Sequence, residues 1–475
     1  MSFLRTSPGS GELSAIARFL TAAEAGRHRL HSFMIVKNGS VIFERFWKPY
    51  APNLRHKLYS LSKSFTSVGV GIAIDEGLLR TDTLLSDIFG EEFERLGDRI
   101  PERTRRMTIR HLLTMNTGQS YENWAENNIE GFLTAEVEFE PGTAFNYNTL
   151  ATYMLSAAIT RLTGESLAQW LKPRLFEPLG IDAYWETDGE TGINLGGVGL
   201  NAHTEDLAAL GQLLINKGLW NGKRIVSEEY VAAASSNLTP SNHSANSIDW
   251  TLGYGYQFWQ CQPKGVFRGD GMFGQYIICE PETQTVIAVT GNAEMQSVME
   301  LFWTLLAEMK TPKLASAELP PERSLLTVSA AAAPYPDFRA VYEVTPFENA
   351  MPRFPLTSLS IDFSAEGECL LLMYAGTAPA VLSLLLNQSG WYYTAATYLP
   401  DRFFSSDGGY YGRAYILGEW SGDTFTAKMW FNETPCLDEW KFEFSPGRES
   451  VTISYRGFAY NSRFEKVGVG LRISA

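Results

Sequence analysis

The sequence predicts an α+β domain followed by a separate all-β domain. Strand-like runs occur near the N-terminus and again between about residues 254 and 290, whereas helical patterns dominate the residues between them. Beyond about residue 310, short alternating segments separated by turn residues replace the helical patterns. Strands on both sides of a helical insertion favour an antiparallel sheet flanked by helices, with a helical subdomain. At 475 residues, the chain is also longer than one hydrophobic core normally serves.

The first expected elements are a helix and a hairpin. Residues 13–30 form an amphipathic pattern with charged side chains, unlike a signal peptide or a membrane anchor. Two strand-like runs, residues 31–37 and 40–47, follow and are joined by Asn38-Gly39, which is a strong hairpin signal. The other expected helices of this domain cover residues 109–115, 149–163, 204–217 and 300–309. Its other expected strands cover residues 254–260, 274–280 and 285–290.

The second domain is predicted from a change in composition. Residues 310–336 are rich in proline and alanine, as in a linker. We therefore expect a first domain at residues 1–312, a linker at 313–337 and a β domain at 338–475. The expected strands of the β domain cover residues 356–363, 369–374, 390–394, 425–431, 439–444 and 451–455. Regular short strands of this kind favour a small closed barrel or a sandwich.

The charge balance argues against some classes of partner. The chain has 53 acidic and 39 basic side chains, which gives a formal net charge of -14. Such a surface repels phosphate backbones and anionic lipid, so we expect neither nucleic acid nor a membrane as a partner. The first eleven residues contain no apolar run, and the helix after them carries charges, which favours a cytoplasmic location.

The cysteines and histidines predict no metal site. The chain has no CxxC pair, and its six histidines share no ligand spacing with the four cysteines, Cys261, Cys279, Cys369 and Cys436. We therefore expect buried thiols, and neither a metal nor an organic cofactor.

An S-x-x-K pair carries the strongest chemical signal. Ser60 and Lys63 open an apolar run typical of a buried helix, and no other serine lies three residues before a lysine. Residues three apart share one helix face, so the lysine amine can take the serine proton if burial lowers its pKa. The Ser60 N–H, at the positive end of the helix, would then help to stabilise an oxyanion. The pattern therefore predicts a nucleophilic serine.

Other segments resemble elements of the serine β-lactamase and penicillin-binding-protein superfamily. They are T-I-R-H-L-L-T-M-N-T-G at 108–118, P-G-T-A-F-N-Y-N-T at 141–149, G-G-V-G-L at 196–200 with T-E-D-L at 204–207, and W-N-G-K-R-I-V at 220–226. These segments occur in family order between about residues 32 and 309. The pattern is similar to that of class C β-lactamases and their esterase, D-aminopeptidase and amide-hydrolase relatives.

The resemblance implies further site residues. It makes Tyr147 the second proton-transfer group, beside Ser60 and Lys63. Where the family has an asparagine that contacts substrate and lysine, this chain has the hydroxyl of Thr149. The neighbouring Asn148 could substitute only by turning towards the substrate. This departure argues against efficient turnover of penicillins and cephalosporins.

The third family element, K-T-G in class C enzymes and often H-x-G in esterase-like relatives, is also altered. One alignment places Arg268 in the basic position and Asp270 in place of the motif glycine, so that Gly271 supplies the second oxyanion N–H. A shift of one residue places Gly269 in the basic position, keeps Gly271 as the motif glycine and makes Met272 the donor. We favour the first alignment because it retains a cation. Arg268 and Asp270 would then point together towards the substrate, and their pairing would favour neutral substrates.

These residues predict acyl transfer to water through an acyl-enzyme on Ser60. The expected substrate is a small ester or amide, as in an esterase or a D-amino-acid amidase. The alternative within this class acts on a peptide-like substrate or a lactam, as a D-Ala-D-Ala carboxypeptidase or a weak class C β-lactamase. An alternative of another class is a catalytically silent peptide-binding protein, which the residues Thr149 and Asp270 favour. No oligomeric state is predicted.

The β domain occupies the position of the small lipocalin-like barrels that are appended to some members of this superfamily, and it resembles them in that respect. Aromatic residues at strand spacing are more often core residues than the lining of a ligand cavity. We expect a core role for Trp391, Tyr392, Tyr393, Tyr410, Tyr411, Trp420, Trp430 and Trp440.

Overall fold

The structure is a computed structural model. It describes residues 3–119, 128–188, 191–239, 247–311, 318–322, 338–346, 357–363, 368–374, 382–387, 392–399, 410–431, 437–457 and 465–474. The chain divides into two compact units, one comprising Met1–Phe46 and Pro52–Pro321 and the other Trp47–Ala51 and Glu322–Ala475. Most of the expected linker, residues 313–337, lies outside the described residues.

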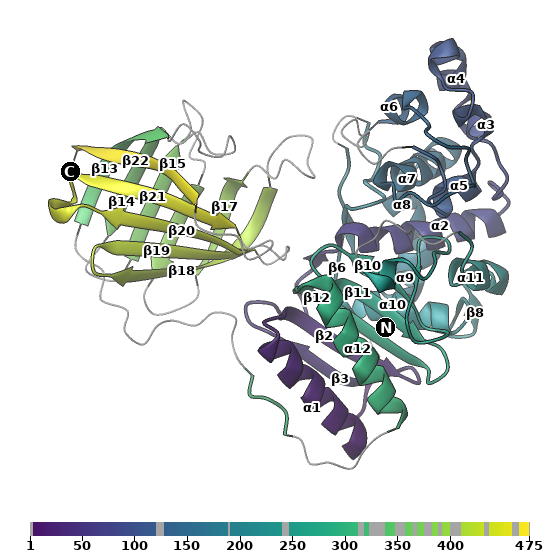
Figure 1. The fold of residues 1–475 in the computed structure, drawn as a ribbon, viewed down its shortest axis with the longest axis horizontal. Coiled ribbons are helices and arrows are strands. Elements are labelled where there is room, and N and C mark those ends of the chain that lie inside the picture. Colours follow the sequence, from purple (N-terminus) through teal and green to yellow (C-terminus); the bar gives the residue numbers. More distant parts are fainter. Residues whose placement is uncertain are drawn as a thin grey trace. The chain divides into compact units, whose positions relative to one another are not determined.

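The first unit is built on a sheet of seven described strands (Figure 1). In spatial order they are β1 (Leu4–Arg5), β3 (Ser40–Phe46), β2 (Arg29–Lys37), β12 (Thr285–Asn292), β11 (Gln275–Glu280), β10 (Phe267–Gly271) and β9 (Trp259–Gln260). Neighbours among these described strands are antiparallel, except that β1 runs parallel to β3. In the turn between β2 and β3, Asn38 has φ 49° and Gly39 has φ 76°. Two positive φ angles are what a type I′ hairpin requires, so the predicted hairpin is confirmed.

One face of the sheet is covered by the first and last helices of the unit. α1 (Ser10–Ala25) and α12 (Met295–Lys310) lie side by side in Figure 1. Phe19 of α1 stacks on Phe33 of β2, with ring centroids 4.8 Å apart, and on Phe302 of α12 at 5.2 Å. Aromatic rings packed in this way bury a large apolar area and join both helices to the sheet.

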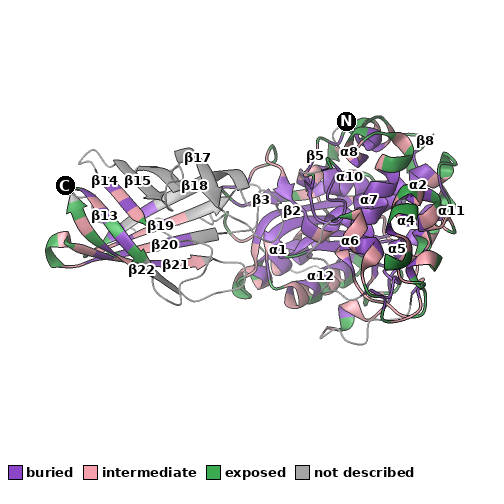
Figure 2. Ribbon diagram, turned by 90° about the horizontal axis from the view of Figure 1, so that it is seen from above, coloured by how far each residue is buried: buried purple, intermediate pink, exposed green. Residues whose placement is uncertain are grey.

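The opposite face is covered by α10 (Thr204–Ile215) and the helical insertion. Gly211 of α10 lies so close to the sheet that a Cβ there would be 2.5 Å from Val286 Cγ1. The other helices are α2 (Ser62–Asp75), α3 (Leu85–Ile88), α4 (Gly90–Leu96), α5 (Ile109–Leu113), α6 (Ile129–Thr134), α7 (Thr149–Thr163), α8 (Leu167–Leu171), α9 (Glu177–Leu179) and α11 (Glu228–Ala234). α2 is buried over nearly its whole length (Figure 2). None of the described helices combines the length and apolar character that crossing a membrane requires.

One predicted strand is much shorter than expected. Residues 254–260 were expected to form a single strand, but only Trp259–Gln260 does so, as β9. The N–H of Gly255 donates to the carbonyl of Phe258 at 2.8 Å, and Gln257 has φ 66°. The chain therefore turns back on itself before β9 begins, and a strand cannot contain such a turn.

The described strands of the second unit form one antiparallel sheet of ten strands. In spatial order they are β16 (Leu382–Asn387), β15 (Glu368–Tyr374), β14 (Ser358–Phe363), β13 (Phe338–Pro346), β22 (Glu465–Ser474), β21 (Ser450–Gly457), β20 (Leu437–Phe444), β19 (Thr424–Phe431), β18 (Tyr410–Ser421) and β17 (Tyr392–Leu399). The end strands β16 and β17 approach to within 8 Å between Cα atoms. The sheet therefore curls on itself as a barrel does, and the predicted all-β domain is confirmed.

Aromatic side chains pack together in the described core of this unit, among buried aliphatic residues. The Phe363 ring contacts Trp420 and Phe425, with centroid separations of 5.1 Å and 4.8 Å, and Trp420 stacks on Phe444 at 5.3 Å. Trp440 is also buried. The expectation of a core role is therefore confirmed for Trp420 and Trp440, whereas Trp391 lies outside the described residues.

Candidate active site

The two residues of the S-x-x-K pair contact each other at the start of α2. Ser60 occupies a short 3₁₀ turn, η1 (Tyr59–Leu61), that leads directly into the helix. Residues three apart nearly eclipse one another in this geometry. Lys63 Nζ accordingly lies 3.0 Å from Ser60 Oγ. Ser60 is half-buried, and Lys63 is only 1% exposed.

Tyr59, the residue before Ser60, has an unusual backbone conformation. Its φ is 49°, a value that bulky residues rarely adopt and that persists only where neighbouring contacts enforce it. The buried Tyr59 ring lies 5.1 Å from the Phe273 ring at an interplanar angle of 72°, and Lys57 Nζ lies 5.7 Å from its centroid. These contacts hold the segment that presents Ser60.

The segment leading into α7 brings two more candidate residues to Lys63. Thr149 Oγ1 lies 3.2 Å from Lys63 Nζ, so its hydroxyl takes the lysine contact that the resemblance assigns to an asparagine. The Tyr147 ring centroid lies 4.9 Å from the same nitrogen. The Tyr147 ring also stacks on Trp259, with centroids 5.9 Å apart and an interplanar angle of 15°. Three candidate residues, Ser60, Thr149 and Tyr147, thus surround the buried amine of Lys63.

The segment that carries Tyr147 is held by the turn after α5. The N–H groups of Gly142 and Asn146 donate to the carbonyls of Asn116 and Met115, at 2.8 Å and 2.9 Å. The Asn116 side chain also donates to the carbonyl of Ala144 at 3.1 Å. The family-like segment at 108–118 therefore positions the proton-transfer candidate and contributes no reactive group of its own.

Asn148 caps α7, so it does not make the turn towards substrate by which it could have substituted for the family's asparagine. Its Oδ1 accepts the N–H of Leu150 at 2.9 Å, and its Nδ2 donates to Gln119 Oε1 at 3.3 Å. The side chain is buried, with 3% exposed. The residue that precedes a helix is placed to satisfy the helix's free N–H groups, and this use occupies the carboxamide.

A third acceptor of Lys63, which the sequence analysis missed, is the carbonyl of Gly197, 2.7 Å from Nζ. The loop that carries it is joined to α2 by a 2.8 Å hydrogen bond from Thr66 Oγ1 to the carbonyl of Gly196. A Cβ at position 197 would lie 2.8 Å from Thr149 Cγ2, so a side chain there would prevent the approach. The glycines of G-G-V-G-L are the sequence feature from which such a close contact could have been predicted.

These contacts determine the protonation and the orientation of the Lys63 amine. Burial lowers the pKa of Lys63 to about 7, although the Asp270 carboxylate acts in the opposite direction. A neutral amine has two N–H groups and one lone pair. If the N–H groups donate to Gly197 and Thr149, the lone pair faces the Ser60 hydroxyl. The amine is then oriented to accept the serine proton.

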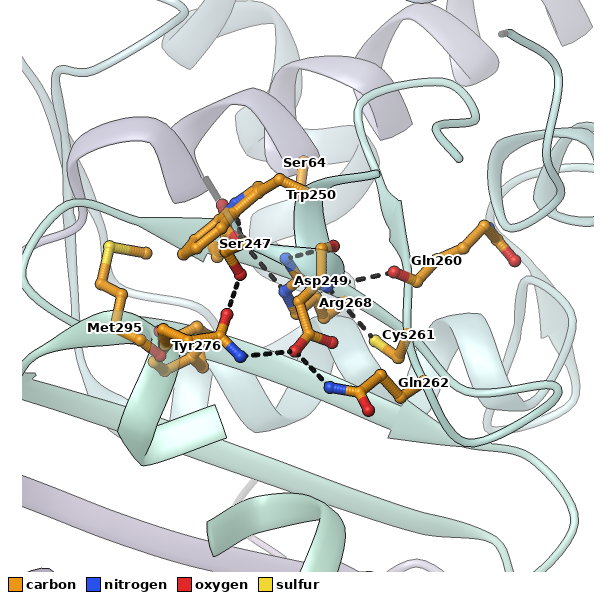
Figure 3. Close-up of polar contacts among 12 residues, drawn as sticks. Ser64, Ser247, Asp249, Trp250, Gln260, Cys261, Gln262, Arg268, Tyr276 and Met295 are labelled. Atoms are coloured by element: carbon orange, nitrogen blue, oxygen red, sulfur yellow. Dashed lines mark hydrogen bonds and ion pairs between the residues drawn. The ribbon is translucent and has the colours of Figure 1, made fainter. Parts of the chain in front are cut away.

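The structure contradicts the expectation that Arg268 and Asp270 point together towards the substrate, although it confirms that they pair. Arg268 and Asp270 do pair, with Nε 3.0 Å from Oδ2, but Arg268 is 0% exposed. Its two terminal nitrogens donate to the carbonyls of Gln260 and Asp249, each at 3.1 Å (Figure 3). Asp270 lies opposite Tyr276, whose ring packs against α12. Both charged residues therefore belong to the buried α12 face of β10.

The other face of β10 carries glycines and lies against the nucleophile segment. A Cβ at Gly269 would be 2.3 Å from Ser64 Oγ, and one at Gly271 would be 2.1 Å from the Leu58 carbonyl and 3.1 Å from the Leu61 nitrogen. A side chain at position 269 would collide with the side chain of Ser64, and none fits between the two backbones at Gly271. This face matches the alternative alignment, in which Gly269 stands in the basic position and Gly271 is the motif glycine.

The turn after β10 distinguishes the two candidate oxyanion donors. The carbonyl of Gly271 accepts the N–H of Gly274 at 3.1 Å, and so points into the turn that leads to β11. In a trans peptide the C=O and the N–H point in opposite directions, so the Met272 N–H points away from β11. N–H groups alternate between the two edges of a strand, so the Gly271 N–H points towards β11. The geometry therefore favours Met272.

The described residues contain no group of three or more His, Cys, Asp or Glu side chains that could hold a metal ion. Cys261 and Cys279 are buried free thiols, in accordance with the expectation, and Cys436 lies outside the described residues. Burial raises the pKa of Cys261 to about 12, which keeps this thiol protonated.

The chain is similar in sequence to a family of known proteins and to individual enzymes. The Beta-lactamase family matches residues 17–303, more than half of the chain. The chain is 25% identical over 287 residues to a 6-aminohexanoate-dimer hydrolase of Paenarthrobacter ureafaciens, which covers 54% of this chain and 71% of that protein. It is 27% identical over 153 residues to a lovastatin esterase of Penicillium rubens, which covers 26% of this chain and 37% of that protein.

The fold also has solved counterparts. A penicillin-binding protein homolog from Caulobacter crescentus superposes with a TM-score of 0.53, over 64% of this chain and 98% of that chain, at 17% identity. At this identity the likeness concerns the fold alone. The family match over more than half of the chain shows that this protein belongs to the Beta-lactamase family of serine hydrolases.

Proposed function

We propose that this protein hydrolyses small neutral esters or amides through an acyl-enzyme on Ser60. The observation that carries the proposal is the buried Lys63 amine, which lies 3.0 Å from Ser60 Oγ and has a pKa lowered to about 7. Such an amine can accept the serine proton near neutral pH. The names of two relatives, 6-aminohexanoate-dimer hydrolase and lovastatin esterase, support an amide or ester carbonyl as the target.

The proposed reaction has two acyl-transfer steps. Ser60 Oγ attacks the carbonyl carbon while its proton passes to Lys63, and the tetrahedral adduct then expels an alcohol or amine. Tyr147, whose ring lies against the same amine, passes a proton to the leaving group. Water attacks the acyl-enzyme in the second step, and returns a proton to the serine through the same groups. The products are a carboxylic acid and the alcohol or amine.

We assign the oxyanion hole to the N–H groups of Ser60 and Met272. The close approach of β10 to the nucleophile segment at Gly271 supports this assignment, since it leaves backbone against backbone there. Preorganised N–H groups directed at the developing negative charge are commonly a large source of catalysis. The preference for Met272 over Gly271 follows from the orientation of the peptide between them.

The proposed preference for neutral substrates rests on the third family element. Arg268 is buried and paired with Asp270, and Gly269 carries no side chain, so β10 offers no cation to a substrate carboxylate. The charged group that affects the pKa of Lys63 is the carboxylate of Asp270, which would repel a substrate carboxylate. Thr149 replaces the carboxamide that would hold an acylamide carbonyl. These features weigh against penicillins and cephalosporins, which carry a carboxylate.

A substrate comparison tests the proposed function. We expect kcat/KM for p-nitrophenyl butyrate to exceed that for nitrocefin by about 100-fold, because a hydrogen bond to a charged group contributes roughly that much. D-Amino-acid anilides, measured alongside, separate amidase from esterase activity, and the Ser60→Ala variant gives the background. Nitrocefin turnover equal to ester turnover would contradict the neutral-substrate proposal. Absence of turnover and of fluorophosphonate labelling in the folded wild type would indicate a silent binding protein.

The pH profile reports the protonation of Lys63. The amine must be neutral to act as a base, so kcat/KM for p-nitrophenyl butyrate should rise about tenfold per pH unit below about pH 7 and then level off. The Asp270 carboxylate raises the pKa of Lys63, so Asp270→Asn should move the midpoint to lower pH. Profiles measured between about pH 5 and 9 check both expectations. A rate that is flat or falls over this range would contradict a base with this pKa.

A further inference from the structure

A single buried glutamine holds the turn that carries Met272. Gln275, the first residue of β11, is 0% exposed. Its Nε2 donates to the carbonyls of Met272 and Gly291, each at 2.9 Å, and its Oε1 accepts the N–H of Gly291 at 3.0 Å. Both N–H groups of the carboxamide and its oxygen are therefore engaged, which leaves the side chain little freedom. This side chain connects the turn to β12.

The backbone on either side of Met272 is held as well. The carbonyl of Gly271 accepts from Gly274, and the carbonyl of Phe273 accepts the N–H of Ala293 at 2.9 Å. With the bond from Gln275, three successive carbonyls of the turn have defined donors. Phe273 has φ 69°, a conformation that needs such support in a residue with a bulky side chain, whereas Gly274 adopts its φ of 93° without strain. Of the three bonds, only the one to Met272 comes from a side chain, so a change of side chain removes it without altering the backbone.

The turn is also in contact with the nucleophile segment. The Phe273 ring lies 5.1 Å from the ring of Tyr59. Phe273 follows Met272, and Tyr59 precedes Ser60, so each ring is adjacent to one of the two proposed donor residues. A shift of the turn would therefore change the separation of the two N–H groups that must converge on one oxygen.

We propose that Gln275 is a positioning residue of the oxyanion hole, which it maintains by holding the Met272 carbonyl. This inference rests on the proposed function, because it takes Met272 as the second donor. Oxyanion stabilisation depends on donors within about 2.7–3.1 Å of the developing charge, so a small displacement of the turn is costly. Because the charge develops only in the transition state, loss of Gln275 should slow acylation without weakening the binding of the uncharged substrate.

The experiment compares Gln275→Leu with wild type on three quantities. We expect the rate of acylation by p-nitrophenyl butyrate to fall about 10- to 100-fold, the range for a misplaced catalytic group. Affinity for an alkylboronic acid, which forms a tetrahedral adduct with the serine, should fall by a similar factor. Affinity for butyl p-nitrophenyl ether, an unreactive analogue, should stay within about twofold. Gln275→Glu removes donors while it keeps the size of the side chain, and it replaces Gln275→Leu if that variant does not fold.

A matched control separates positioning from a general loss of stability. Gln212 of α10 is also buried, at 3% exposed, and its Nε2 donates to Asn216 at 3.0 Å. Gln212→Leu should leave acylation and boronate affinity unchanged. Acylation by the Gln275 variants within about twofold of wild type, or an equal loss of boronate and ether binding, would overturn the positioning role. Failure of the proposed function would give a different result, because the Ser60→Ala variant would then hydrolyse the ester as fast as the wild type.

Discussion

Replacement of Ser60 by alanine should abolish covalent labelling by a fluorophosphonate and lower ester turnover by about 10⁶-fold, the cost of removing a serine nucleophile in a hydrolase. The change removes one half-buried hydroxyl next to Lys63 and leaves the apolar core of α2 intact. The fold should therefore persist, as measured by circular dichroism and thermal unfolding. Mass spectrometry of the labelled wild type should locate the adduct on Ser60 alone.

A serine of α2, the helix that follows Ser60, provides the control for this variant. Ser67 Oγ lies 3.0 Å from the Tyr230 hydroxyl and donates to the carbonyl of Tyr256, so it is a structural serine. Ser67→Ala should lose stability but keep the label and the turnover per folded molecule. Unchanged turnover in Ser60→Ala would refute the acyl-enzyme mechanism and require another nucleophile.

Removal of either proton-transfer group should have the second largest effect. We expect Lys63→Met and Tyr147→Phe each to lower the acylation rate by about two to four powers of ten, the range for positioned acid–base groups. Tyr147→Phe keeps the ring that stacks on Trp259 and removes only the hydroxyl. Binding of butyl p-nitrophenyl ether should survive both changes. Stopped-flow release of p-nitrophenol measures the acylation rate directly.

Lys63→Arg distinguishes a base from a fixed positive charge. A guanidinium stays protonated in proteins and cannot accept the serine proton. The arginine variant should therefore be as slow as Lys63→Met if the lysine acts as a base. Substantial activity in Lys63→Arg would indicate an electrostatic role, and near wild-type activity in Tyr147→Phe at every pH would make that tyrosine structural.

Short patterns of neighbouring residues were sufficient to predict the class of fold and the contact between Ser60 and Lys63. The Asn38-Gly39 turn, the buried α2 and the helix α7 were predicted from a few consecutive residues each, and all are present. Ser60 and Lys63 meet because their spacing of three residues brings them together in any right-handed helical turn. Interactions between near neighbours in sequence depend little on the rest of the chain.

Short sequence patterns failed to give the correct alignment of the third family element, because that alignment depends on which face of β10 is buried. The alignment that kept Arg268 as a cation differed from its alternative by one residue, and a shift of one residue exchanges the two faces of a strand. The structure places Arg268 under α12 and Gly269 against the nucleophile segment. The packing of β10 between α2 and α12 decides which side chains face each helix. The residues next to Arg268 in the sequence do not indicate this packing.

The sequence by itself determined the class of fold, through composition and periodicity, and the contact between Ser60 and Lys63, through their spacing. The family followed from segments that resemble those of known members. The tertiary structure alone decided the environment of that pair. The carbonyl of Gly197, the hydroxyl of Thr149 and the ring of Tyr147 come from segments far from Lys63 in the chain. The low pKa of Lys63 comes from the burial of its amine in the folded chain. Desolvation is a property of the whole packed environment, so it becomes defined only when the chain has folded.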